Sequence, residues 1–273
     1  MEIVGCSPDS FRVFVVLFCL PLAAQDPGGL QPRQLYYKSK SALETEQKTV
    51  EKGPDKGQAT KSTTGSGGRH RLKTTASETH NTGNKGTTEP GPLGLKYIVE
   101  REDASGKHTQ VDADSTFRTG EAIRFRIEVN SDAYVYLVAR GASGDGNFLF
   151  PMAGEDNRLK AFQSVQVPAE PADPIRFDEP AGTETLYILV SRSPVPDLDR
   201  LLPARGLVAS AKVPRARLDQ IADRMQSRDL VRGKVTPSSN AGPADVNETA
   251  AYAVNVSKTP GAQVLQKLDL KHR

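Results

Sequence analysis

The strongest constraint on the fold is an alternating stretch that is followed at once by an apolar one. Residues 122–130 read AIRFRIEVN, and every second side chain is apolar: Ile123, Phe125, Ile127 and Val129. Because side chains alternate between the two faces of a strand, this pattern predicts a strand with one buried face. Residues 133–140, AYVYLVAR, are apolar on both faces, which predicts a central strand covered on both sides. Together they indicate a two-layer β structure.

Further short apolar runs, separated by Gly, Pro, Asn and Asp, extend this pattern to both sides. Order is expected to begin at residue 92, and residues 184–192 (ETLYILVSR) form a second candidate for a long central strand. Many short strands at this spacing are typical of sandwiches and barrels. We therefore predict a mainly β fold, an Ig-like antiparallel β-sandwich, in a single domain over residues 92–273.

Two later segments depart from the short-strand pattern. Within residues 195–232, apolar side chains recur at i, i+3, i+4 and i+7 at Leu218, Ile221, Ala222 and Met225, which predicts an amphipathic helix in a short helical insertion. The alternating runs within residues 250–272 then predict a C-terminal β-hairpin that returns to the sheet.

The first 24 residues resemble a secretory signal peptide. An apolar run follows Arg12, contains Pro21 and ends in small residues, so we expect cleavage after Ala24. Both cysteines, Cys6 and Cys19, lie in this segment, and the mature chain would contain neither. We expect Sec-type export to the periplasm or the extracellular medium, with no membrane span after cleavage. An uncleaved anchor is the alternative.

Residues 25–91 are predicted to be a disordered, low-complexity linker. They are rich in Gly, Ser, Thr and Lys and contain few apolar residues, so they cannot bury enough surface to offset the entropy of ordering. A small apolar cluster, RQLYYK near residue 35, is the part of this linker that could dock locally.

Charge and local motifs give no chemistry. A formal net charge of +3 argues against a nucleic-acid binder, which would carry a clustered basic face. The loop GASGDGN, residues 141–147, lacks the spacing of a nucleophile elbow or a dinucleotide loop and fits a hairpin turn. Asp112 and Asp114 lack the further oxygen ligands of a calcium loop. We therefore predict no catalytic residue, metal or cofactor.

One candidate interaction face combines aromatic and basic side chains from neighbouring strands. It comprises Tyr134, Tyr136, Phe148, Arg124 and Arg126. Exposed tyrosines could stack on sugars or hold a peptide, and the arginines could contact an anionic polymer. Tyrosine is also a good strand residue whose hydroxyl reaches the rim of a core, so packing between the layers is the favoured interpretation.

Several blocks, in order along the chain, resemble one bacterial family. They are LGLKYIVERE, FRTGEAIRFRIEVNSDAYVYLV, LFPMAGEDNRL, FDEPAGTETLYILVSR and the ending YAVN…LDLKHR. Together they are similar to the domain-of-unknown-function family numbered 4384, over about residues 93–273, with Glu121 where the family usually has Asp. The resemblance implies a small, mostly β domain in secreted or envelope proteins, with no assigned activity or ligand residues.

The sequence leaves three functional hypotheses. The first is an exported, non-catalytic β-sandwich module of the cell envelope that acts as an interaction or accessory domain. Its partner would be an unknown envelope protein or a cell-wall glycan. The alternative is a carbohydrate- or peptidoglycan-binding module that uses the tyrosine face. An envelope hydrolase is the least favoured hypothesis.

Overall fold

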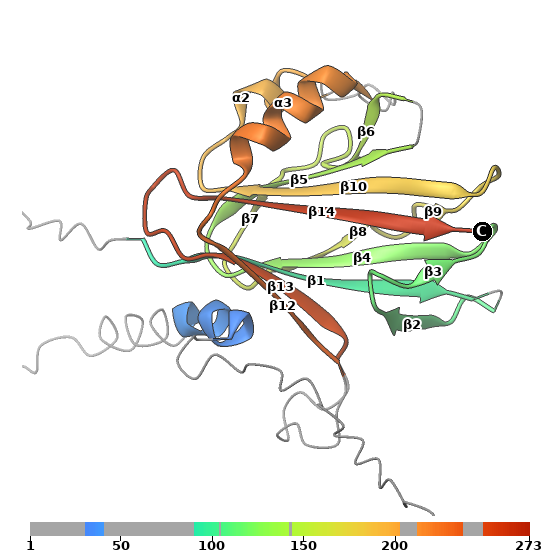
Figure 1. The fold of residues 1–273 in the computed structure, drawn as a ribbon, viewed down its shortest axis with the longest axis horizontal. Helices are drawn as coiled ribbons and strands as arrows, with labels where there is room; N and C mark the ends of the chain where they lie inside the picture. The colour runs from blue at the N-terminus through green and yellow to red at the C-terminus, as the bar shows by residue number, and fades with distance from the viewer. Residues whose placement is uncertain (1–30, 41–89, 104, 142–143, 203–211, 237–247) are drawn as a thin grey trace, which may run out of the picture. The chain divides into compact units, whose positions relative to one another are not determined.

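The computed structural model describes residues 31–40, 90–103, 105–141, 144–202, 212–236 and 248–273. The expected signal peptide and most of the expected linker lie outside these residues. The described part is mainly β, with two sheets of long and short strands stacked face to face (Figure 1). It confirms the predicted β-sandwich. Among the described residues, no helix is long and apolar enough to cross a membrane.

The first sheet, sheet A, is antiparallel throughout. Its main path runs β12-β13-β1-β4-β8, while β2 pairs with β1 and β9 pairs with β4. Its strands are β1 (Leu93–Glu102), β2 (His108–Val111), β4 (Ala122–Val129), β8 (Ser164–Val167), β9 (Ile175–Arg176), β12 (Leu230–Val235) and β13 (Ala250–Asn255).

The second sheet, sheet B, follows the path β11-β6-β5-β10-β14-β3, and β7 pairs with β5. All its pairs are antiparallel except β14 with β3. Its strands are β3 (Thr116–Phe117), β5 (Ala133–Arg140), β6 (Gly146–Phe150), β7 (Arg158–Leu159), β10 (Gly182–Ser191), β11 (Lys212–Val213) and β14 (Gln263–His272).

The main core lies between the two sheets and follows the predicted alternation. The four apolar residues expected on one face of β4 are all fully buried: Ile123, Phe125, Ile127 and Val129. They meet the inward residues of β5 and β10, among them Leu137 and Ile188, in one continuous cluster. Burial of such side chains stabilises each by about 1.5–3 kcal/mol, so this cluster holds the sheets together.

The outer face of sheet B is covered by two helices, α2 (Pro196–Asp199) and α3 (Arg215–Met225), seen above β5 and β10 in Figure 1. The predicted amphipathic face of α3 points at this sheet, because Leu218, Ile221 and Met225 are buried in a second cluster with residues of β5. The strand β5 is therefore buried on both faces, as its sequence predicted, and the helical insertion is confirmed.

The outer face of sheet A carries a third cluster, to which an N-terminal helix contributes. Residues 32–40 are helical (blue in Figure 1), and Tyr36 is fully buried against Ile98, Tyr252 and Val254. The prediction of a disordered linker is wrong for these nine residues. The small RQLYYK cluster supplies enough aromatic surface to hold one short helix on a sheet that is already formed.

The predicted C-terminal hairpin is also wrong. The strand β13 pairs with β1 and β12 in sheet A, whereas β14 pairs with β10 and β3 in sheet B. The short connection after Asn255 carries the chain from one layer to the other, with Ala262 buried in the core. Each strand has an apolar inward face, so each completes a different sheet.

Candidate functional site

The aromatic part of the predicted interaction face is mostly buried. Tyr136 is fully buried and Phe148 is 3% exposed, both in the cluster beneath α2 and α3. The Tyr136 hydroxyl donates a hydrogen bond to Asp199 Oδ1 (2.7 Å) and accepts one from the Val195 amide (3.0 Å). Burial and the bond to Asp199 raise the pKa of Tyr136. Of the three aromatic residues of this face, only Tyr134, which is half-buried, retains access to solvent.

The basic part of that face lies on the other sheet and is engaged within the chain. Arg124 is 6% exposed and donates to the Pro168 and Ala172 carbonyls (2.9 Å each), which anchors the connection between β8 and β9. Arg126 pairs with the Glu100 carboxylate. The structure therefore does not bring the five predicted residues together, because β4 and β5 belong to different sheets.

The other sequence candidates also have structural roles. The Lys234 ammonium group binds both Asp112 and Asp114, so a cation of the chain itself occupies the site considered for calcium. Asp145, in the glycine-rich loop, accepts a hydrogen bond from the Arg215 amide at the start of α3 (3.0 Å). The described residues contain no group of three metal-ligating side chains.

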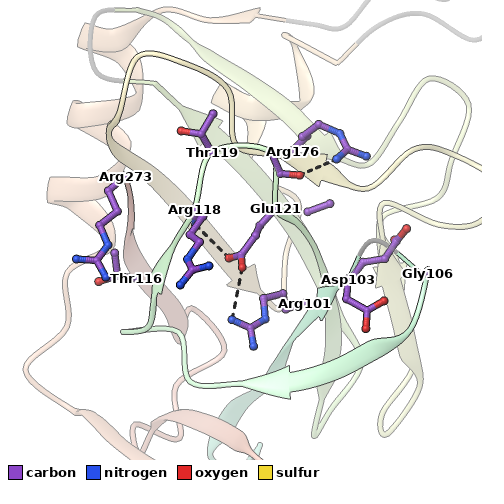
Figure 2. A pocket seen from close by; sticks show the side chains of 12 residues that line it. Arg101, Asp103, Gly106, Thr116, Arg118, Thr119, Glu121, Arg176 and Arg273 are labelled. Atoms are coloured by element: carbon purple, nitrogen blue, oxygen red, sulfur yellow. Dashed lines mark hydrogen bonds and ion pairs between the residues drawn. The ribbon is translucent and has the colours of Figure 1, made fainter.

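A pocket of about 950 Å³ lies where the ends of several strands from both sheets meet. It is formed by the end of β1 and the turn after it, by β3 and the turn leading into β4, by β9 and by the end of β14 (Figure 2). Four arginines and three carboxylates supply its charge: Arg101, Arg118, Arg176, Arg273, Glu102, Asp103 and Glu121.

The wall of the pocket is a tight turn between β3 and β4. The Arg118 amide donates to Glu121 Oε2 and the Glu121 amide donates to the Arg118 carbonyl, each at 3.0 Å. Gly120 has a φ of +87°, a left-handed conformation that favours glycine. Its amide donates to the Phe177 carbonyl (2.7 Å). These bonds fix the backbone from which the Arg118 side chain extends.

All three carboxylates of the pocket already interact with groups of the chain. Glu121 accepts the Arg118 amide and lies 3.8 Å from Arg101 Nη1. Asp103 accepts from the Ser105 and Lys107 amides, and its bonds with the Ser105 hydroxyl and these amides lower its pKa. Glu102 Oε2 lies 3.8 Å from Arg124 Nε. Each of these acids therefore has donors or a cation of the chain beside it, and Asp103 keeps its negative charge.

Two of the four arginines retain their full donor capacity. Arg176 donates to the Gly120 carbonyl (2.7 Å), and Arg101 is shared with Glu121. By contrast, the guanidinium groups of Arg118 and Arg273 make no hydrogen bond or ion pair with any other described residue, and both side chains are exposed. Figure 2 shows both side chains at the pocket, Arg118 on the turn after β3 and Arg273 after the end of β14.

Their positions are set by the backbone. The Thr119 amide donates to the Arg273 carbonyl (3.0 Å), and the Arg273 amide donates to the Phe117 carbonyl (3.1 Å), so the end of β14 is held against the turn. Planar guanidinium groups bind carboxylates and phosphates through paired N–H donors. The pocket is thus suited to an anionic group that Arg118 and Arg273 contact together.

Sequence reasoning missed this site because its parts are distant along the chain. Arg101, Arg118, Arg176 and Arg273 occupy four separate elements and form no local motif. The parallel pairing of β3 with β14 is what brings Arg118 next to Arg273. Glu121 and the glycine at position 120 were the local signal of a fixed turn here.

Comparison with known proteins bears on the central part of the chain. Residues 116–194 match the family model described as domain of unknown function (DUF4384), which confirms the resemblance over β3 to β10. No curated protein and no solved structure matches the chain at a significant level.

Proposed function

We propose that the protein is an exported, non-catalytic β-sandwich module of the cell envelope that binds an anionic ligand in the arginine pocket. One observation carries the proposal: Arg118 and Arg273 both line the pocket on a hydrogen-bonded framework, and neither guanidinium group has a partner among the described residues. The ligand would be a carboxylate- or phosphate-bearing part of an envelope protein or a cell-wall glycan.

The chemistry of the pocket supports binding rather than turnover. The described lining residues provide guanidinium groups, threonine hydroxyls and carboxylates that are already bonded to the chain. A general acid or base needs a group whose pKa lies near the working pH, and arginine stays protonated throughout that range. Arginine pairs of this kind orient and neutralise an anion.

Export is supported by the first 24 residues, whose apolar run ends in Leu22-Ala23-Ala24. Fractionation of cells that produce the full chain, with mass spectrometry of its N-terminus, tests this part. The expected result is a mature protein in the periplasm or medium that begins at Gln25. Retention in the cytoplasm with residue 1 intact would contradict it.

Ligand binding is tested with the full chain in two assays. The first is co-sedimentation with isolated cell-wall sacculi, and the second measures binding of a soluble poly-glutamate peptide, the protein-like probe. The variant Arg118→Gln/Arg273→Gln should weaken binding by about tenfold or more per arginine, since each charge-assisted hydrogen bond contributes about 1.5–3 kcal/mol. The matched control is Arg228→Gln/Lys258→Gln, which removes the same charge from exposed positions outside the pocket.

Equal loss of binding in both variants would show that net charge, not the pocket, holds the ligand. Hydrolysis of the sacculi by the purified protein would contradict the non-catalytic part of the proposal.

A further inference from the structure

The arginine pocket also presents a negative charge that a ligand can meet. Asp103 lies on the turn after β1, in sheet A, whereas Arg273 follows β14, in sheet B, and both line the same pocket (Figure 2). Stacked sheets lie about 10 Å apart. The Asp103 carboxylate therefore reaches the pocket from a different layer than the Arg273 guanidinium group, and the two opposite charges can contact different parts of one ligand.

Only one carboxylate oxygen of Asp103 is used within the chain. Oδ1 accepts hydrogen bonds from the Ser105 amide (2.8 Å), the Ser105 hydroxyl (2.6 Å) and the Lys107 amide (3.0 Å). These bonds, with a smaller contribution from the Lys107 charge, lower the pKa of Asp103, so its carboxylate is ionised at neutral pH. Within the described residues, Oδ2 makes no hydrogen bond or ion pair, and the side chain is exposed.

The turn that carries Asp103 is closed by its own backbone. The Asp103 amide donates to the Lys107 carbonyl (3.1 Å), and the Gly106 amide donates to the Asp103 carbonyl (2.9 Å). Gly106 has a φ of +79°, a left-handed conformation that favours glycine. The carboxylate is therefore held in place before any ligand arrives, which reduces the ordering that binding requires.

The charges of the lining argue against a purely anionic ligand. Four arginines stand against three carboxylates, which leaves one net positive charge. A polyanion would bring negative charge next to the ionised Asp103, and like charges placed together oppose binding. The volume of about 950 Å³ lies at the upper end of the range for ligand pockets, about 300–1,000 Å³, so a ligand with more than one charged group fits.

We propose that the ligand of the arginine pocket is a short zwitterionic peptide, whose carboxylate binds Arg118 and Arg273 and whose ammonium group binds Asp103. This inference rests on the proposed function, because it takes the arginine pair as the holder of the anionic group. A ligand of this kind leaves neither the two arginines nor the aspartate without a partner. A phosphate polymer lacks the ammonium group, and a neutral sugar lacks both charges.

The test compares two forms of one tripeptide by isothermal titration calorimetry with the full chain. Ala-Glu-Lys carries equal numbers of ammonium and carboxylate groups at neutral pH, whereas its fully acetylated form keeps only the carboxylates. The wild type should bind the free form about two- to fivefold more tightly, which is the effect of one exposed ion pair. A site that selects negative charge alone would bind the acetylated form at least as tightly.

The variant Asp103→Asn isolates the negative charge. An asparagine keeps a side-chain oxygen that can accept from Ser105 and Lys107, so the turn is preserved. This variant should no longer prefer the free tripeptide. The matched control is Asp223→Asn, which removes the same charge from an exposed position on α3 outside the pocket and should keep the preference of the wild type.

The outcomes separate this inference from the proposed function. If the wild type binds the acetylated tripeptide equally or more tightly, and Arg118→Gln/Arg273→Gln still weakens binding, the zwitterionic ligand is overturned and the anion site stands. The same conclusion follows if sacculi or poly-glutamate bind through the arginine pair and neither tripeptide binds. A preference for the free form that persists in Asp103→Asn overturns the role of Asp103. Binding that never depends on the arginine pair, whatever the probe, overturns both.

Discussion

The two outer faces of the sandwich are both covered by helices, but the covers differ in origin and chemistry. Sheet B is covered by α2 and α3, which lie in the chain between β10 and β12, and the contact is largely aliphatic. Sheet A is covered by residues 32–40, and the contact is aromatic. Helices that lie in sequence between strands of the sandwich are part of its folding unit. A helix that is far from the strands in sequence instead binds the sheet much as a ligand would.

Ion pairs sharpen the difference. Asp197, at the start of α2, binds Arg217 and Arg224 of α3, so the two helices of sheet B are tied to each other as well as to the core. In the described part of the chain, the N-terminal helix has no such second helix beside it. Releasing the N-terminal helix from sheet A should therefore cost less free energy than releasing α2 and α3 from sheet B.

The largest effect is expected from Leu218→Ala in α3. Leu218 is fully buried between α3 and sheet B, so the substitution should reduce the free energy of unfolding of the whole domain by about 2–5 kcal/mol. Chemical denaturation measures this. The exposed Gln220→Ala on the same helix is the control and should change stability by no more than about 0.5 kcal/mol. A small effect of Leu218→Ala would remove the distinction between the two covers.

A smaller global effect is expected from Tyr36→Ala, although Tyr36 is the larger side chain. Its loss should release the N-terminal helix and leave the sandwich folded, at a cost to global stability of about 1 kcal/mol. Trypsin cleavage after Arg33 and Lys40, followed by mass spectrometry, should accelerate in the variant. Cooperative unfolding of the whole domain would show that the helix belongs to the folding unit.

Alkaline pH should release the sheet A cover. Burial, followed by the neighbouring Glu128 carboxylate, raises the pKa of Tyr36 far above its ordinary value of 10.0, and burial also raises that of Tyr252. The folded state therefore holds protons that the released state gives up. Docking is fully stable below pH 10 and weakens as pH rises above it. Trypsin protection of residues 32–40 should fall as pH rises above about 10, and less steeply in Tyr36→Phe.

Acidic pH should weaken the contact between α2 and α3 on sheet B. Hydrogen bonding to Arg224 and the nearby Arg217 charge lower the pKa of Asp197 below its ordinary value of 3.8. The contribution of Asp197 to the free energy of unfolding is present above pH 3.8 and is lost as pH falls through the lowered pKa. Because both arginine partners are exposed, solvent screens these ion pairs, and the expected effect is the smallest here. Denaturation curves of Asp197→Asn should depend less on pH below 4 than those of the wild type, and an unchanged dependence would contradict the role of the ion pairs.

Much of the sandwich is predictable from its sequence because burial follows a period of two along each strand. The side chains of β4 and the helical spacing of Leu218 and Ile221 determine their own faces, whatever the partners are. The pairing of β13 and β14 is different. An alternating strand fits either layer equally well, and closeness along the chain wrongly suggested a hairpin. Tyr36 was missed as a core residue because its partners lie sixty or more positions away in sequence.

The residues of the candidate site were also hard to predict, because their neighbours are distant in sequence. Tyr136 and Phe148 were expected either on an interaction face or packed between the two layers, but they pack beneath α2 and α3 on the outer face of sheet B. Exposure cannot be inferred from a strand alone. Arg118 and Arg273 are ordinary charged residues in the sequence. They become a pair only because β3 and β14 run parallel, and long-range strand pairing has no local signal.

The parallel contact between β3 and β14 also has a mechanical consequence. The pocket joins the end of β1 in sheet A to the ends of β3 and β14 in sheet B, so an anion held by Arg101, Arg118 and Arg273 would cross-link the two layers at their edge. Force applied along the last strand would then load the bound ligand as well as the strand hydrogen bonds. If the protein is the envelope module proposed above, its layers would be held together most firmly when its ligand is in place.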